Sequence, residues 1–167
     1  MRVKEMQDYV NDLWKRQAVQ KIIKENKYVI PGRSEKYKWR MNPPQVRLCA
    51  TGTYSSAYYR NITHMIEVEV WYYSGGAEVK STLRHEMAHA LLEGCLRYIS
   101  QKTPSVKKDP HRKEYKELLK KLFPRTWQSD MYWKETSRNM KERQKWIDKM
   151  IHLDNIECDE DLGGKKL

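Results

Sequence analysis

Cysteine and phenylalanine are scarce in this chain of 167 residues, which contains three Cys and one Phe. The cysteines, at positions 49, 95 and 158, are odd in number and widely spaced, with no C-x-x-C pair. This pattern argues against a disulfide framework and against a zinc site built from cysteines. Six Trp and eleven Tyr supply large apolar surfaces in place of Phe. The low mean hydropathy of −0.95 therefore does not indicate a disordered chain.

Long apolar runs are absent too. No segment approaches the roughly 20 apolar residues that a membrane-spanning helix needs. The opening residues, MRVKE, do not resemble a signal peptide. We therefore expect an intracellular, cytoplasmic protein. The length predicts a single domain, 1–167, with one real core and helical additions.

Acidic side chains are outnumbered by basic ones, with 22 Asp and Glu against 33 Lys and Arg and a net charge of +11. An excess of this size favours an anionic partner such as nucleic acid or an acidic surface. The positive charges are spread along the chain. The plainer interpretation, a protein with many solvated lysines, therefore stays open.

The residues His85, Glu86 and His89 form an H-E-x-x-H motif. On a helix, two histidines four residues apart lie on one face, about one turn apart, so both can reach a single small cation. Glu86 can then hold a metal-bound water. Two nitrogen ligands, an open position for water and a carboxylate that accepts a proton are the minimal machinery of a zinc hydrolase.

The segment around the motif has the pattern of an amphipathic helix. Gly75-Gly76 ends the preceding segment. Apolar or small residues then recur at spacings of three and four, at Val79, Leu83, Met87, Ala90, Leu91 and Gly94. Leu83 and Met87 lie nearly opposite the two histidines, so one face can pack on a core while the other faces a cleft. The alternative is a pair of ordinary histidines on a solvated helix face.

A catalytic zinc usually takes three protein ligands. We favour His111 as the third, 22 residues after His89 (111 minus 89). It falls in the first turn of a predicted helix that Asp109-Pro110 would begin, with Asp as N-cap and Pro in the first helical position. Glu114, one turn further, and Asp109 are the alternatives. The remaining histidines of interest are expected to be structural or to lie at the surface: His64 and His152.

The apolar periodicities predict an α+β fold, in which a small antiparallel sheet packs beside the helix that carries the motif. The expected elements are a helix at 4–26, an edge strand at 37–41, strands at 45–54 and 64–73, a helix at 109–123 and a C-terminal helical extension at 127–153. The segment 52–63 is interpreted as a long hairpin loop or as a continuation of the strands. The core is expected at about residues 37–123.

This arrangement resembles the SprT-like (Spartan-type) metallopeptidase family. The resemblance rests on the segment 83–92, LRHEMAHALL, on the strands before it, and on His111 followed four residues later by Tyr115. Family members carry H-E-x-x-H and a downstream H-G-x-x-F type segment, in which Arg112 replaces the glycine here. The resemblance covers about Gln45 to Phe123.

The resemblance implies His85, His89 and His111 as zinc ligands and Glu86 as the general base. It also implies a minigluzincin-like core, a small sheet with the metal helix packed beside it. Members are linked to nucleic acid, including proteolysis of proteins crosslinked to DNA, which the positive net charge would suit. Many members also have a C-terminal zinc ribbon. Cys158 stands alone here, so we expect a compact form without that ribbon.

The leading functional hypothesis is a zinc-dependent endopeptidase, in which Glu86 takes a proton from the attacking water and returns it to the leaving amine. Its substrate would be a protein or peptide, with DNA as a further partner. Cobalt, nickel or manganese could use the same ligands as zinc. The donor to the oxyanion is left open among four residues: Tyr58, Tyr59, Arg112 and Tyr115.

Two other functions are kept as alternatives. The first is a non-catalytic nucleic-acid-binding module that zinc staples through a closed site of four ligands. The second is a peptidase for a specific regulatory protein, with no nucleic acid involved.

Overall fold

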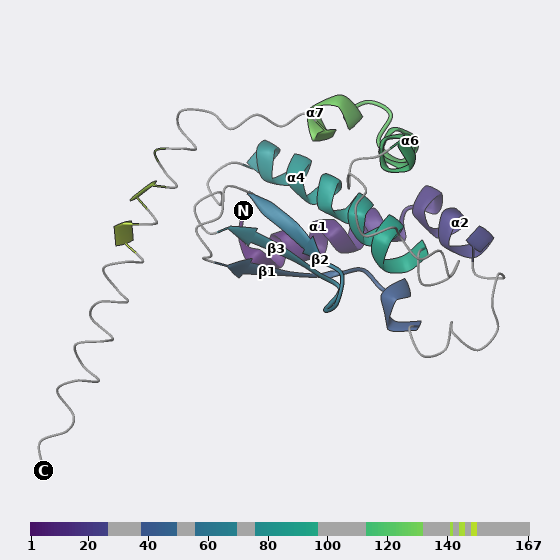
Figure 1. The fold of residues 1–167 in the computed structure, drawn as a ribbon, viewed down its shortest axis with the longest axis horizontal. Coiled ribbons are helices and arrows are strands. Elements are labelled where there is room, and N and C mark those ends of the chain that lie inside the picture. The colour runs from purple at the N-terminus through teal and green to yellow at the C-terminus, as the bar shows by residue number, and fades with distance from the viewer. Residues whose placement is uncertain are drawn as a thin grey trace, which may run out of the picture.

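The computed structural model describes residues 1–26, 38–49, 56–69, 76–96 and 113–131, together with 141, 144–145 and 148–149. Within these residues the chain has an α+β fold with a three-stranded mixed sheet (Figure 1). The elements before the motif are the helices α1 (Val3–Lys15), α2 (Gln17–Asn26) and η2 (Lys38–Met41), and the strands β1 (Gln45–Cys49), β2 (Ala57–Arg60) and β3 (Met65–Glu69). The helices that follow are α4 (Gly76–His89), the π-helix η4 (Ala90–Leu96), α6 (Lys113–Leu122) and α7 (Trp127–Met131).

The sheet has the order β1-β3-β2. β2 pairs antiparallel with β3, whereas β1 pairs parallel with β3, with Val46 opposite Ile66. The expectation of an antiparallel sheet is therefore wrong for one of its two pairings. The segment 57–60, which was interpreted as loop or strand extension, forms a strand of its own and occupies one side of β3. β1 is left with the other side of β3 and runs in the same direction.

A short turn at residues 61–64 connects β2 to β3. His64 closes it with a φ of 52°, in the left-handed region where histidine is found more often than most residues. The main-chain oxygen of His64 also accepts a hydrogen bond from the Gln45 N–H at 3.2 Å, which joins the turn to the start of β1. The turn therefore sets the relative positions of all three strands.

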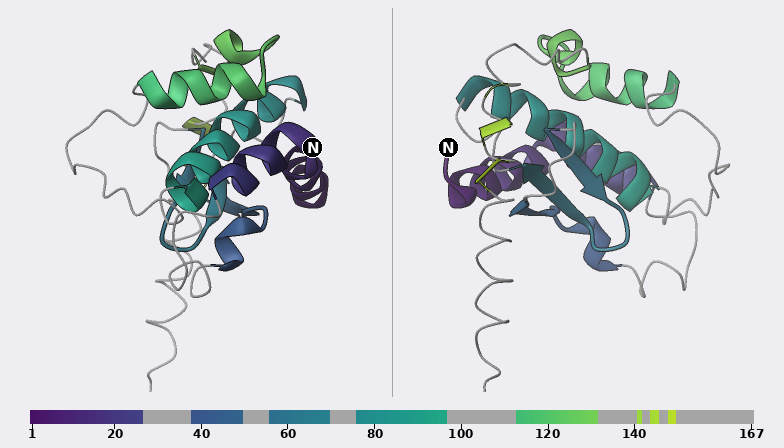
Figure 2. Two further views of the ribbon diagram at one scale, coloured as in Figure 1. Left: turned by 90° about the vertical axis from the view of Figure 1, so that its right-hand side faces the viewer. Right: turned by 60° about the vertical axis from the view of Figure 1, so that its left-hand side comes forward.

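The helices α1, α4, α6 and α7 form two layers on one face of the sheet. α1 and α4 pack next to the sheet, and α6 and α7 lie against α4 on its other side, as Figure 2 shows. The strands present Val46, Ala57, Ile66 and Val68 to the helical layer. The helices meet them with a core that includes Met6, Val10, Leu13, Leu83 and Met87. This packing confirms the apolar faces that periodicity assigns to α1 and α4.

The N-terminal segment, expected as one helix at 4–26, forms two helices that meet at Arg16. The backbone of Arg16 is extended, with φ −57° and ψ 140°. The Nε2 of Gln20 donates to the carbonyl of Trp14 at 2.8 Å, which satisfies one of the acceptors left at the end of α1. Both helices keep their apolar residues in the core, so the hydrophobic stripe continues across the break and gives no sign of it.

The expected edge strand at 37–41 is wrong within the residues described, because Lys38–Met41 form the 3₁₀ helix η2. The indole N–H of Trp14 donates to the carbonyl of Met41 at 2.8 Å and holds this turn against α1. A second contact from α1 covers the free edge of β1, since the N–H of Val46 donates to Oε1 of Gln7 at 2.7 Å. This contact satisfies one backbone donor of the β1 edge.

The C-terminal part agrees with the expectations where it is described. α6 falls inside the helix expected at 109–123, and its proposed start at residues 109–112 lies outside the described residues. α7 begins the expected extension at 127–153, most of which also lies outside them. None of the helices in the described part of the chain is long and apolar enough to span a membrane.

Candidate metal centre

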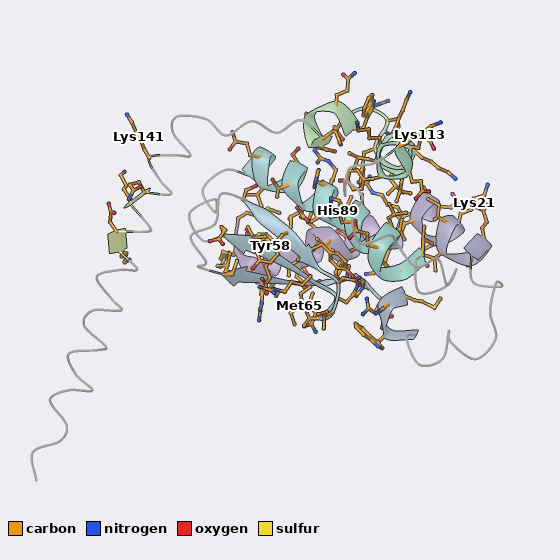
Figure 3. The ribbon with its side chains drawn as sticks, in the orientation of Figure 1. Lys21, Tyr58, Met65, His89, Lys113 and Lys141 are labelled. Atoms are coloured by element: carbon orange, nitrogen blue, oxygen red, sulfur yellow. The ribbon has the colours of Figure 1, made fainter. Side chains whose placement is uncertain are left out.

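The H-E-x-x-H motif occupies the last turn and a half of α4. Leu83 and Met87 are fully buried in the core on one side of this helix. Glu86 and His89 are also buried, each with an exposed fraction of 7%. The motif therefore does not lie on a solvated helix surface, as the alternative interpretation of the two histidines requires. Figure 3 shows His89 on α4, between the sheet that carries Tyr58 and the helix that begins at Lys113.

Hydrogen bonds orient both imidazole rings. Nδ1 of His85 lies 2.8 Å from the main-chain oxygen of Asp130, and Nδ1 of His89 lies 3.1 Å from Oε1 of Glu93. A carbonyl and an ionised carboxylate can only accept, so each Nδ1 carries a proton and donates it. In the neutral rings both Nε2 atoms are then lone-pair donors, and they face each other at 3.2 Å.

This separation fits two ligands of one zinc ion. Zinc binds imidazole nitrogen at about 2.0–2.1 Å in tetrahedral geometry, which places two ligand nitrogens about 3.3 Å apart. The observed Nε2 to Nε2 distance of 3.2 Å is close to that value. The Nδ1 hydrogen bonds are the contacts that metal-binding histidines usually make with their second nitrogen. The spacing of the two histidines therefore fits one zinc ion, and the Nδ1 contacts favour the tautomer in which Nε2 is the metal-binding nitrogen.

The third ligand is not fixed by the part of the chain that the structure describes. No group of three His, Cys, Asp or Glu that could hold a metal ion is found among those residues. His111 and Asp109 lie outside them. Glu114 is described, is exposed on α6, and does not form such a group with the two histidines. Of the three candidates, Glu114 alone lies among the described residues, and the choice of the third ligand stays a prediction.

The carboxyl group of Glu86 lies beside the edge of β2. Burial raises the pKa of Glu86, while His89 and the backbone N–H of Tyr59 act in the opposite direction. Tyr59 stands opposite Ile66, and the neighbouring bond from the Glu69 N–H to Ser56 O identifies Tyr59 as a non-hydrogen-bonded position. Its N–H therefore points away from β3 and toward α4, where it meets the Glu86 carboxylate.

Tyr115 of α6 forms one wall of the site. Its ring stacks on His89, with centroids 4.1 Å apart and planes at 21°, and it also contacts His85 at 5.2 Å. The hydroxyl donates to the carbonyl of His85 at 3.0 Å. Tyr115 is fully buried, and burial raises its pKa above the usual value. This side chain holds the histidines in place from the side opposite the sheet.

The expected oxyanion donors are directed elsewhere where they are described. The Tyr115 hydroxyl bonds to a backbone carbonyl, and the Tyr59 hydroxyl lies 2.7 Å from Nδ1 of His64. The Tyr58 hydroxyl accepts a hydrogen bond from Arg60 at 3.0 Å on the other face of the sheet. Arg112 lies outside the described residues. Each of the three tyrosine hydroxyls therefore has a hydrogen-bond partner other than the two Nε2 atoms.

Sequence reasoning missed the residues that orient the histidines. Glu93 stands four positions after His89, and this i, i+4 spacing is a local signal that could have identified it. Asp130 is 45 positions from His85 and carries no local signal. Its contact with His85 depends on the packing of α7 against α4.

Searches of protein-family models, curated proteins and solved structures return no match to this chain. The resemblance to the SprT-like family therefore stays a prediction that rests on the motif residues and on the arrangement around them.

Proposed function

We propose that this chain is a zinc-dependent endopeptidase in which His85 and His89 hold the metal ion and Glu86 is the general base. One observation carries the proposal: the two Nε2 atoms lie 3.2 Å apart, while each Nδ1 is bound to an acceptor. His111 is the proposed third ligand. It precedes Tyr115 by four residues, and Tyr115 contacts both rings of the motif. The first turn of α6 thus lies beside the two histidines.

The chemistry follows from the positions of the side chains. When bound, zinc supplies Lewis acidity, which polarises a peptide carbonyl and lowers the pKa of water toward about 7. Glu86 accepts the proton of the attacking water and returns it to the leaving amine. Its carboxylate is placed for this by the N–H of Tyr59 and by its position next to His85 on α4. The hydrogen bonds at Nδ1 hold the two rings with Nε2 directed at one point.

Glu86 also favours an enzyme over the zinc-stapled binding module. A closed structural site needs four ligands and makes no use of an additional buried carboxylate. A buried carboxylate beside the proposed ligands suits a proton acceptor, and Glu86, next to His85 on α4, has that position.

We further propose that the substrates are DNA-associated proteins, including proteins crosslinked to DNA. The net charge of +11 supports an anionic partner, and the family that the motif resembles acts on such substrates. Cleavage stimulated by DNA at low salt, and much less at high salt, would support this substrate class. Cleavage that is indifferent to DNA would favour a peptidase for a specific regulatory protein.

The test uses two variants of the full chain, Glu86→Gln and Glu78→Gln. Both remove one carboxylate from α4, but Glu78 is exposed in the first turn and serves as the matched control. Zinc content is measured by elemental analysis, and cleavage is measured with casein and with a DNA-crosslinked protein. We expect both variants to keep zinc and only Glu86→Gln to lose hydrolysis. Undiminished cleavage by Glu86→Gln would contradict the role of Glu86 as the general base.

A further inference from the structure

Asp130 is a buried acidic residue outside the H-E-x-x-H motif. Its side chain is fully buried, and four hydrogen bonds converge on its two carboxylate oxygens. Oδ1 accepts from Ser81 Oγ and from Arg84 Nη2, each at 2.6 Å. Oδ2 accepts from Arg84 Nε at 2.7 Å and from Thr126 Oγ1 at 2.8 Å. The bidentate bond to Arg84 fixes α7 firmly against α4, because a guanidinium fork matches a carboxylate in both distance and direction.

The main chain of the same residue touches the motif directly. The carbonyl oxygen of Asp130 accepts the Nδ1 proton of His85 at 2.8 Å. Ser81, Arg84 and His85 lie on one face of α4, at spacings of three and four. The side chain of Asp130 therefore binds that face of α4 through hydrogen bonds, while its carbonyl orients the histidine on the same face.

The two histidines differ in how their second nitrogen is held. His89 uses Glu93, which belongs to the π-helix that continues α4. His85 depends on a residue 45 positions away, so its acceptor is present only when α7 is docked. Arg84 adds a third element, because its Nη1 donates to the hydroxyl of Tyr9 in α1 at 2.9 Å. The orientation of His85 is thus tied to the packing of α1, α4 and α7.

We propose that Asp130 is a positioning residue for the metal centre: its carboxylate docks α7 on α4, and its carbonyl holds His85 with Nδ1 protonated and Nε2 directed at the metal position. The part of this inference that concerns metal affinity rests on the proposed function. Loss of a hydrogen bond to the second nitrogen of a metal-binding histidine typically weakens metal binding by about 10–100-fold. Asp130→Asn keeps the main-chain carbonyl but removes the charge that pairs with Arg84 and docks α7, so the carbonyl is displaced from His85 and an effect of that size is expected.

If Asp130 only stabilises the fold, its substitution lowers stability without changing metal affinity. A matched control variant separates this role from a positioning role. Glu67 is likewise a fully buried carboxylate that two arginines hold, Arg47 and Arg60. It lies on the face of the sheet opposite the helices, because it alternates with Ile66 and Val68, which face the core. Glu67→Gln therefore removes a comparable charge on the face of the sheet that is turned away from the motif. If Asp130 served stability alone, both variants would lose stability and keep metal affinity.

The experiment measures three quantities on wild type, Asp130→Asn and Glu67→Gln in the full chain. The dissociation constant for Zn²⁺ is obtained by competition with a chelating dye, and the stability of the metal-free protein by urea unfolding. The tautomer of His85 is read from two-bond ¹H–¹⁵N correlations of the metal-free protein. We expect Asp130→Asn to bind zinc 10–100-fold more weakly and to populate the other His85 tautomer. Glu67→Gln should keep zinc affinity within a factor of about two.

Zinc affinity and tautomer unchanged in folded Asp130→Asn would overturn the proposal. If Asp130→Asn does not fold, Ser81→Ala removes one donor to the same carboxylate without removing a charge, and a smaller shift of the same two readouts is then expected. Their absence in folded Ser81→Ala would likewise count against it. Failure of the proposed function is distinguishable: wild type would bind no zinc if the metal site is absent, or would bind zinc without cleaving protein if the site is not catalytic. In both cases the tautomer measurement still decides whether Asp130 orients His85.

Discussion

The phenolic oxygen of Tyr59 occupies the space that a Cβ atom on Gly94 would need. Gly94 belongs to the π-helix after the motif, and Tyr59 belongs to the edge strand β2, so the two elements approach closely at this point. The same hydroxyl lies 2.7 Å from Nδ1 of His64, while the backbone N–H of Tyr59 meets the carboxylate of Glu86. Any side chain at position 94 would therefore displace a residue that contacts the candidate general base.

The first prediction follows from that contact. Gly94→Ala gains about 1 kcal/mol of helix propensity, but the overlap with Tyr59 costs about 1–3 kcal/mol. We expect a net loss of stability of about 1 kcal/mol in urea unfolding. In a Tyr59→Phe background the loss should be smaller, because the overlapping oxygen is gone. A Gly94→Ala variant more stable than wild type would contradict the close approach.

The second prediction concerns pH. Burial lowers the pKa of His64, the bond to the carbonyl of Asn42 acts against this, and the positive charge of Arg40 adds to it. The neutral ring is thus the folded form, held between the Tyr59 hydroxyl and the Asn42 carbonyl. When the pKa of a histidine is lower in the folded state than in the unfolded state, its neutral form stabilises the fold. This contribution is fully present above the pKa of the unfolded state, about 6.5. The contribution to stability falls as the pH drops toward the pKa of His64 in the folded state, by at most about 1.4 kcal/mol per pH unit.

Urea unfolding of the metal-free protein between pH 5 and pH 8 measures this effect. His64→Asn is the control, because asparagine tolerates the positive φ and does not titrate in this range. The stability difference between wild type and His64→Asn should shift against wild type as the pH falls below about 6.5. A difference that is independent of pH would show that His64 has the same pKa in the folded and unfolded states, which would contradict the prediction.

The third prediction separates the two contacts of Tyr115. Tyr115→Phe keeps the ring stacked on His89 and loses the hydrogen bond to the His85 carbonyl, at a cost of about 0.5–1.5 kcal/mol. Tyr115→Ala also removes a fully buried ring, which costs about 3–5 kcal/mol for an aromatic side chain. Urea unfolding gives both values, and a zinc titration should show weaker binding only for the alanine variant. Equal losses for the two variants would assign the stabilisation to the hydroxyl.

The fourth prediction identifies the third ligand. We expect His111→Ala to lose zinc in elemental analysis and Glu114→Ala to retain it, because Glu114 is exposed on α6 and does not join the histidines in a metal group. The two residues are three positions apart, so each variant is the other's local control. Zinc lost only in Glu114→Ala would replace His111 by Glu114.

Helical elements of this fold were largely predictable, because their signal is repeated within a few residues. Leu83 and Met87 recur at helical spacing, and both are buried in α4 as expected. The strands were less predictable from the sequence than the helices. Alternation marks Val46 and Ile66 as facing the core, but it does not say which strand lies beside which or in what direction. The parallel pairing of β1 with β3 and the separate strand β2 were therefore missed.

The sequence by itself determined the chemical groups of the candidate site and their spacing on one helix, since His85, Glu86 and His89 lie within a single turn and a half of α4. Only the tertiary structure decided how those groups are held. The acceptor for His85 comes from Asp130, the ring against His89 from Tyr115, and the donor to Glu86 from Tyr59. A helical turn is a local property that its own side chains specify. A contact between segments distant in the chain exists only after the whole core has closed, because it depends on the packing of every element between them.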